Sequence, residues 1–273
     1  MSRNSKLLLS LALALLASTA AADGDYFSPT GERIAISLGI IKVAPSTSVR
    51  VDSSAGVAGT TLNGEDDLGL DSSVIEPKFE ASVRAGQRSR LFFDYFTLDR
   101  DDTKVLALPP GAAFGDVVLL NGDPVQTVLS LRILGVTYGY SFLHNEKFEL
   151  SGLIGINDTE ISSSVRVQSP TRHIFDAQSL AGPFPTPGLA ATWAVSKHFY
   201  VDATAKYLKV SIDHLEGSLS IYDFEAFYRV SPNVAFAVGY SGTRANLLSR
   251  QSKDSGAFIF DAKGPELFVR VAF

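Results

Sequence analysis

The sequence has 273 residues, of which 45% are hydrophobic and 19% are charged, and its formal net charge is −5. This acidic balance argues against nucleic-acid binding, which needs Lys and Arg to neutralise phosphates, and 18 Phe, 9 Tyr and 1 Trp are too many for a disordered chain. Because the chain has no cysteine, disulfide frameworks, thiolate metal sites and thiol nucleophiles are excluded.

The first residues have the pattern of a secretory signal peptide. Two basic residues, Arg3 and Lys6, precede an apolar core over residues 7–17, and an Ala-x-Ala cleavage motif follows. We therefore expect a signal peptide over residues 1–22 and one domain over residues 23–273. That domain would carry 22 basic and 29 acidic residues, a net charge of −7.

The rest of the sequence offers no segment for a membrane-spanning helix. Such a helix needs about 20 consecutive apolar residues, and the long uncharged stretch at residues 177–196 contains Pro183, Pro185 and Pro187. These prolines exclude a continuous helix because each removes a hydrogen bond and clashes with the preceding turn. If the chain crosses a membrane, it is expected to cross with strands.

Period-two alternation of apolar and polar residues, typical of β-strands, dominates the chain after the signal peptide. For example, Phe79, Ala81 and Val83 alternate with Glu80 and Ser82. The pattern predicts ten strands, at residues 33–44, 74–86, 90–100, 127–142, 147–157, 187–196, 198–210, 218–230, 233–243 and 258–273. Most exceed the five or six residues usual in soluble sheets and match the roughly 9–11 tilted residues that cross a bilayer.

Two of these strands carry an irregularity. The apolar face of strand 127–142 changes side near Leu134 and Gly135, which predicts a β-bulge there. The last strand is either continuous or divided into two short pieces at Gly264 and Pro265. A count of eight or twelve strands therefore stays open beside ten.

The connections between the predicted strands alternate between short and long. Tight turns are expected at residues 86–89, 143–146, 197 and 231–233, and longer loops at residues 45–73, 101–126, 158–186, 211–217 and 244–257. Short periplasmic turns and longer extracellular loops are typical of outer-membrane barrels. An even number of strands also returns both chain ends to the same side.

Aromatic residues recur near both ends of the predicted strands, as in the girdles at the two interfaces of a membrane. Those beside the short turns are Tyr140, Phe142, Phe148, Trp193, Phe199 and Tyr228, and those toward the long loops are Tyr95, Tyr207, Tyr222 and Tyr240. Alternation alone also fits a soluble β-sandwich with aromatics in its core. The girdles, the strand lengths and the loop asymmetry favour a barrel in lipid.

The C-terminus carries apolar residues at alternate positions, namely Leu267, Val269, Val271 and Phe273. This pattern resembles the closing strand of bacterial outer-membrane β-barrel proteins, and the chain is similar in overall pattern to small single-chain barrels of the OmpA or OmpW type. The resemblance implies an all-β, antiparallel up-and-down barrel in the outer membrane, in contact with its lipid and lipopolysaccharide. It also implies assembly by the barrel-assembly machinery through the C-terminal strand ending at Phe273.

If the apolar face of each strand meets lipid, the opposite face lines the lumen. Thirteen charged residues lie on that face: Lys78, Glu80, Arg84, Asp94, Arg132, Glu149, Asp202, Lys206, Asp223, Glu225, Arg229, Glu266 and Arg270. These seven acids and six bases nearly balance, as buried charges must if each is to be paired. Because about eight strands leave room for little beyond side chains, ten strands predict a mostly filled lumen. A narrow hydrophilic path lined by these charges is the alternative.

The four histidines are the candidates for catalysis, because hydrolases of this architecture need a serine or water activated by a His–carboxylate pair. His144 and His198 lie in predicted short turns, and His173 has no obvious partner. His214 follows Asp213, but neighbouring residues of a strand point to opposite faces. No catalytic residue is therefore predicted.

Residues 65–71 form the densest cluster of charge, with four carboxylates that could bind Ca²⁺ or Mg²⁺ through oxygen ligands. The spacing does not fit an EF-hand, because Leu68 stands where that loop needs glycine. A solvated acidic loop is the expectation, and neither a metal nor a cofactor is predicted.

Together these patterns predict an integral outer-membrane β-barrel without catalytic activity. Three functions stay open: a narrow pore for small solutes, a structural or surface-interaction barrel acting through its extracellular loops, and a lipid A- or phospholipid-modifying enzyme. The lumen charges favour the pore, whereas long loops carry recognition more often than strands do.

Overall fold

The computed structural model describes residues 28–107, 111–169, 172–212, 215–249 and 255–273. Its elements are the 3-10 turn η1 (Pro29–Gly31) and the strands β1 (Ile34–Val51), β2 (Leu62–Asn63), β3 (Val74–Arg84), β4 (Ser89–Val105), β5 (Ala113–Phe114), β6 (Val117–Val118), β7 (Pro124–His144), β8 (Phe148–Ser169), β9 (Arg172–Ala194), β10 (Phe199–Ile212), β11 (Leu215–Arg229), β12 (Val234–Ser249) and β13 (Gly256–Ala272). Within the described ranges, no helix is long and apolar enough to cross a membrane. The expected signal peptide lies outside them.

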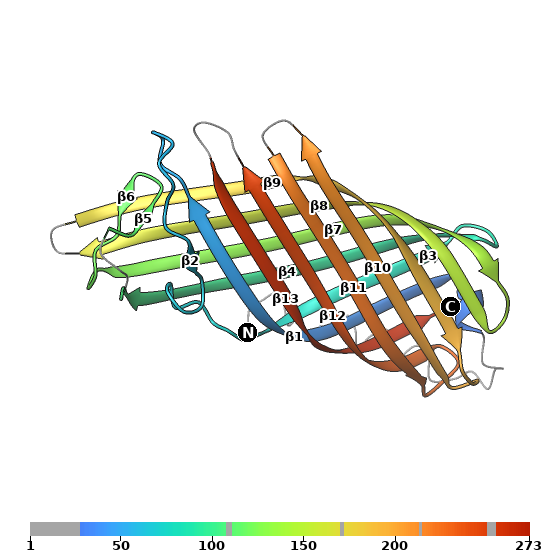
Figure 1. The fold of residues 1–273 in the computed structure, drawn as a ribbon. Coiled ribbons are helices and arrows are strands. Elements are labelled where there is room, and N and C mark those ends of the chain that lie inside the picture. The colour runs from blue at the N-terminus through green and yellow to red at the C-terminus, as the bar shows by residue number, and fades with distance from the viewer. Residues whose placement is uncertain (1–27, 108–110, 170–171, 213–214, 250–254) are drawn as a thin grey trace.

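Ten strands form a closed antiparallel up-and-down barrel, which Figure 1 shows from the side. The order around the wall is β1, β3, β4, β7, β8, β9, β10, β11, β12 and β13, and β13 pairs again with β1. β2 joins β1, while β5 and β6 form a separate small sheet. Closure gives each strand two neighbours, as hydrocarbon requires because it offers backbone groups no water. The predicted fold class and the count of ten strands are confirmed.

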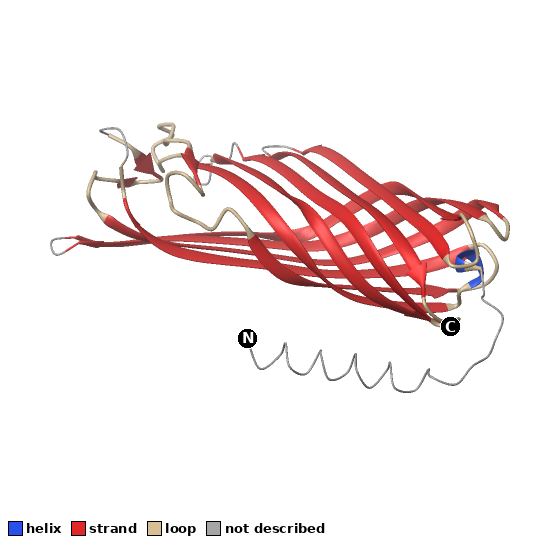
Figure 2. Cartoon of the chain, turned by 90° about the horizontal axis from the view of Figure 1, so that it is seen from below, coloured by secondary structure: helices blue, strands red, loops and turns tan. Residues whose placement is uncertain are grey.

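The tight turns and both ends of the described chain lie at one end of the barrel. In Figure 2, η1 lies beside the C-terminus. The backbone oxygen of Phe273 accepts hydrogen bonds from the amides of Arg33 and Ile34, at 2.6 and 3.1 Å, which joins the two ends. We refer to this end as the periplasmic end, because it carries the turns predicted to be periplasmic, and to the opposite one as the extracellular end.

The strands run farther into the predicted long loops than the sequence indicated. β8 continues to Ser169 and β9 begins at Arg172, so the loop expected at residues 158–186 is mostly a strand hairpin. β1 and β12 likewise extend beyond their predicted ends, to Val51 and Ser249. The loop prediction was wrong here because polar outward residues and three prolines in β9 hide the alternation.

The predicted bulge near Leu134 and Gly135 is also wrong. Odd-numbered residues of β7 stay on the inside from Val125 to Ser141, and the register shift against β8 lies between Ser141 and Leu143. Near Leu134 and Gly135 the side chains of β7 keep their alternating directions, and only the polarity of the inward and outward residues changes. β7 therefore presents apolar residues to the outside in one half and to the inside in the other.

This reversal of polarity divides the whole barrel into two halves. Toward the periplasmic end of β7, the outward residues Leu134, Val136 and Tyr138 are apolar and 42%, 44% and 41% exposed. Toward the extracellular end, the outward position is Arg132 and the inward one is Leu131. The apolar outer band marks the part that meets lipid, and the part with a polar outside and an apolar inside is built like a soluble β-barrel.

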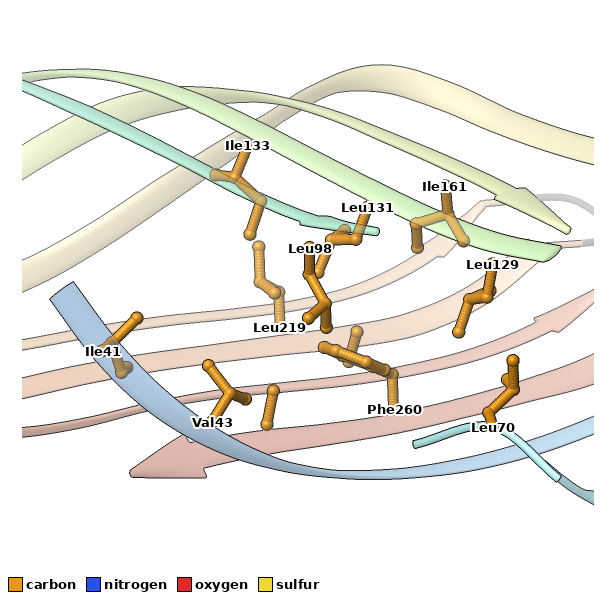
Figure 3. Packing of buried hydrophobic residues seen from close by; sticks show 12 residues of the cluster. Ile41, Val43, Leu70, Leu98, Leu129, Leu131, Ile133, Ile161, Leu219 and Phe260 are labelled. Atoms are coloured by element: carbon orange, nitrogen blue, oxygen red, sulfur yellow. The ribbon is translucent and has the colours of Figure 1, made fainter. Parts of the chain in front are cut away.

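A buried apolar cluster fills the middle of the extracellular half, and Figure 3 shows its side chains converging from the surrounding strands. We call it the apolar core, and its members are Ile41, Val43, Leu70, Leu98, Leu129, Leu131, Ile133, Ile161, Leu219, Ala245, Phe260 and Ala262. A second cluster, which includes Leu62, Leu68, Phe114 and Val165, lies in contact with the loops at the extracellular end. The barrel is therefore packed with side chains across this half.

The closing strand β13 is continuous in its ladder with β12, so the alternative of two separate pieces is wrong. Its ladder with β1 is interrupted between the pairs Ile41–Glu266 and Ala44–Lys263. Gly264 lies in this interruption, and a Cβ atom there would overlap the backbone carbonyl of Lys42. The absence of a side chain at this position lets β1 and β13 approach closely enough to close the wall.

We expect Gly264→Ala to lower the free energy of unfolding by about 1–3 kcal/mol, the usual cost of forcing an extra group into packed structure. The measurement is urea unfolding of the folded protein in lipid, followed by heat-modifiable migration. Gly182→Ala is the matched control, because a Cβ at this position in β9 meets no atom within 4 Å. Equal stability of the two variants would contradict the close approach of β1 and β13.

Candidate functional site: a charged chamber beneath an apolar core

The structure places twelve of the thirteen predicted lumen charges inside the periplasmic half of the barrel. These are Lys78, Glu80, Arg84, Asp94, Glu149, Asp202, Lys206, Asp223, Glu225, Arg229, Glu266 and Arg270. Several of them line a polar chamber of about 90 Å³ together with small residues such as Ala190 and Thr192. The small residues leave space on the β9 side that the charges do not fill.

Arg132 is the exception, and its prediction as a lumen residue was wrong. Its side chain is 44% exposed on the outer face, where Nη2 lies 2.7 Å from Glu160 Oε2 and 3.7 Å from Asp158 Oδ2. The prediction assumed that the apolar residues beside it, Leu131 and Ile133, meet lipid. They belong instead to the apolar core, so Arg132 faces outward above the apolar band.

Lys78 is the centre of the chamber's acidic group. Its Nζ lies 2.7 Å from Asp223 Oδ1, 3.0 Å from Glu266 Oε2 and 3.0 Å from Glu80 Oε1. Glu266 also accepts a hydrogen bond from Ser241 Oγ at 2.8 Å. One lysine thus contacts acids of β3, β11 and β13, and it ties its own strand, β3, to β11 and β13 across the lumen.

A second ionic group closes the periplasmic mouth. Glu32, just after η1, accepts hydrogen bonds from Arg229 and, at 2.8 Å, from Arg270. Arg270 also contacts Asp202 at 3.2 Å. The two guanidinium groups lie 5.1 and 5.9 Å from the ring centre of Tyr200, within range of a cation–π interaction. Two carboxylates, two guanidinium groups and an aromatic ring therefore meet at this mouth.

A third group joins β3, β4 and β8 at the same mouth. Arg84 Nη2 lies 2.7 Å from Glu149 Oε2, and Arg90 Nη2 lies 3.8 Å from the same oxygen. Ser141 Oγ donates to the other oxygen of Glu149. The carboxylate is therefore satisfied on both oxygens, as a buried carboxylate needs to be.

Sequence reasoning missed two members of these groups, Glu32 and Arg90. Arg90 shares the even-numbered face of its strand with Asp94, so side-chain parity could have identified it. Glu32 precedes the first strand, and its role depends on η1 folding back into the mouth. Thr30 Oγ1 donates to the carbonyl of Asn145 at 2.9 Å, a contact across the barrel that no local pattern signals.

The acidic segment at residues 65–71 is a folded cap on the extracellular half and not a solvated loop. Glu65 Oε1 lies 2.6 Å from Arg100, whose side chain is fully buried, and Glu65 Oε2 accepts from the amide of Thr47 at 2.9 Å. Leu68 and Leu70 of the same segment point inward and are 2% and 4% exposed. Among the described residues, no group of three or more His, Asp or Glu could hold a metal ion.

The histidines are dispersed. His144 Nδ1 lies 3.6 Å from Glu149 at the periplasmic end, and His198 stacks on Tyr228 with ring centres 6.3 Å apart. The side chain of His173 and the whole of His214 lie outside the part of the chain that the structure describes. The described histidines thus belong to the periplasmic turns.

No protein-family model and no curated protein matches the chain. Among solved structures, the outer membrane protease OmpT from Escherichia coli matches with a TM-score of 0.54 and 13% identity over 93% of this chain and 100% of that chain.

Two further matches have TM-scores below 0.5. The transport unit of the autotransporter AIDA-I from Escherichia coli gives 0.42, with 8% identity over 88% of this chain and 90% of that chain. The Pseudomonas putida toluene transporter TodX gives 0.39, with 7% identity over 93% and 96%. The closed ten-stranded wall and the OmpT match define the class: the chain has the fold of the small bacterial outer-membrane β-barrels.

We expect Lys78→Met to lower the free energy of unfolding by about 3–5 kcal/mol, because removing one partner leaves the acids around it buried and uncompensated. Urea unfolding in lipid measures the change. Lys42→Met is the control, since Lys42 is exposed on the outside of β1 and surface charges contribute little. Equal losses in both variants would mean that the acids near Lys78 are already solvated.

A second prediction concerns Asp52, which follows β1 outside the apolar band. Burial alone would raise its pKa, but hydrogen bonds from the Gly59 amide and Ser255 Oγ, together with Arg50, lower the pKa below its ordinary value. A lowered pKa stabilises the folded loop above the unfolded value of about 3.9. This stabilisation is lost as pH falls through the folded pKa.

Amide hydrogen exchange near Gly59 tests this linkage. At pH 6 we expect Asp52→Asn to exchange about two- to fivefold faster than the unmodified protein, as for a partly exposed ion pair. The ratio should approach one as the pH falls below the folded pKa of Asp52. A ratio that stays constant with pH would contradict the role of the carboxylate.

Proposed function

We propose that the protein is a non-enzymatic outer-membrane barrel that is closed to ions and hydrophilic solutes and acts through its extracellular half. The apolar core carries this proposal. An ion moving from the charged chamber to the extracellular end would have to pass Leu98, Leu131 and Phe260, which are 1%, 4% and 1% exposed. Stripping water from an ion without a compensating partner is too costly for conduction.

The periplasmic mouth supports the same proposal. Glu32, Arg229 and Arg270 hold one another in short ionic contacts near the ring of Tyr200. Arg270 also pairs with Asp202, so that two acids face two bases at this mouth. A packed polar plug at one end and an apolar core at the other are features of a barrel whose interior stabilises the wall. The charged lumen then serves folding and not transport.

The extracellular half supplies the surface for an interaction role. Its outer face carries charged side chains such as Lys42, Arg132 and Glu160, and the folded cap holds its shape through the Glu65–Arg100 ion pair. A folded, charged rim above the membrane can contact lipopolysaccharide or another molecule outside the cell. Ordered loops presented by a rigid scaffold are the usual place for recognition.

The location and assembly of the protein belong to the same proposal. The signal peptide at residues 1–22 would export the chain, and the outer membrane would supply the lipid around the apolar band. The side chain of Phe273 is 55% exposed on the outer wall at the end of β13. This position would leave it accessible to the barrel-assembly machinery.

A narrow pore for small solutes is the second candidate, favoured by the lining of the charged chamber, which includes Glu80, Asp94 and Glu225. Such a pore would require the apolar core to rearrange. Planar-bilayer recording separates the two candidates.

We expect repeated reconstitutions of the protein to give no resolved single-channel steps, because the apolar core excludes ions. Ohmic steps that disappear in Glu225→Gln but persist in Arg132→Gln would overturn the proposal and establish the pore. Arg132 is the matched control because it is charged but faces outward. Folding of each variant is checked by its heat-modifiable migration.

A further inference from the structure

The barrel wall opens along one seam in its extracellular half. Within the described ranges, β9 and β10 pair only from Ala194–Tyr200 to Gly188–Lys206. Beyond that point β9 stays paired with β8 as far as Arg172, and β10 stays paired with β11 as far as Ile212. In Figure 1 the extracellular parts of β8 and β9 diverge from those of β10 and β11. We call the facing edges beyond Gly188 the lateral seam.

Three prolines explain why the ladder ends there. The amide of Ala194 donates to Lys147 at the β8 side, so even-numbered residues of β9 direct their N–H groups to β8 and odd-numbered ones toward β10. Pro183, Pro185 and Pro187 are all odd-numbered, and each lacks the N–H that would bond to β10. The sequence thus removes three successive donors from one edge of the strand.

The other break in the wall is closed by the cap. β3 and β4 pair only as far as Lys78–Phe96, although β4 continues to Val105. The cap covers this edge of β4, where Arg100 contacts Glu65 and Lys104 donates to the carbonyl of Asp66. Closure of one break by a dedicated segment makes the open lateral seam a distinct feature of the fold.

A small apolar cavity lies directly behind the lateral seam. Phe184 lines it from β9, and Leu208 and Val210 line it from β10, so both edges of the seam contribute. Leu219 and Leu247 line it on the neighbouring strands. The cavity is continuous with the apolar core, because Phe184, Leu208 and Leu247 all pack against that cluster.

The position of the seam and the charge beside it indicate the ligand. Tyr207, 55% exposed on the outside of β10, belongs to the outer aromatic girdle and lies level with the start of the seam. Lys209, one outward position farther along the same edge, is exposed, and no acidic partner is found for it among the described residues. A cation at the level of lipid head groups, next to an opening into an apolar cavity, matches an anionic head on a hydrocarbon chain.

We propose that the lateral seam binds a long-chain fatty acid, with its carboxylate at Lys209 and its chain in the cavity behind Phe184 and Leu208. The chain reaches the cavity sideways, between β9 and β10, and not along the barrel axis. Burial of several methylenes supplies the affinity, and the ion pair sets the orientation. This inference goes beyond the proposed function and does not depend on the barrel being closed to ions.

The test uses a fatty acid with a photoreactive diazirine near its methyl end, added to the protein in phosphatidylcholine nanodiscs. We expect labelling of inward residues such as Phe184, Leu208 and Leu219, and oleate should compete with it much better than methyl oleate. The triple variant Pro183→Val, Pro185→Val, Pro187→Val restores the missing donors. It should reduce inward labelling at least about tenfold, because the chain loses its apolar burial.

Pro265→Val is the matched control, since Pro265 is also an exposed strand proline but lies away from the seam; it should label like the unmodified protein. Val210→Trp fills the cavity from the opposite edge and should give the same loss as the triple variant if that variant folds poorly. Labelling confined to outward residues such as Leu189 would overturn the proposal. So would inward labelling that is unchanged in both seam variants, or equal competition by methyl oleate.

Discussion

A backbone in hydrocarbon must satisfy its hydrogen bonds within the chain, and the barrel is organised by where that requirement applies and where it ends. In the apolar band all ten strands pair with both neighbours, and β13 closes onto β1. Beyond the band water can satisfy a free edge, and there two ladders stop. One break is covered by the cap and the other is kept open by prolines.

The same change of environment explains why the interior has two different chemistries. Inside the lipid band the outer face must be apolar, so alternation leaves the polar residues for the lumen, where Lys78 and Arg270 each contact more than one acid. Outside the band the outer face meets water, and the apolar residues turn inward as in a soluble protein. The boundary falls within single strands, so β7 and β10 each serve both environments.

This boundary also decides how much the sequence could predict. Period-two alternation was sufficient for ten strands and for their pairing in order, because each strand is long and its neighbours are adjacent in the chain. Arg132 was assigned to the wrong face because a single rule, apolar outward, was applied beyond the level where it holds. Glu32 and the cap segment were not recognisable because their partners, Arg229 and Arg100, come from distant strands. The alternation of residues within one strand does not show which side chain of a distant strand each residue will contact.

The apolar core and the lateral seam are physically linked. A set of side chains that excludes ions from the barrel axis also offers a hydrocarbon-like medium to any apolar molecule that can reach it. Access along the axis is blocked by the charged plug at Glu32 and by the cap. The free edge at Pro183, Pro185 and Pro187 supplies the remaining direction, at the level where lipid head groups lie. The barrel is thus closed along its axis by packed side chains, and it is open at its side because β9 cannot complete its ladder with β10.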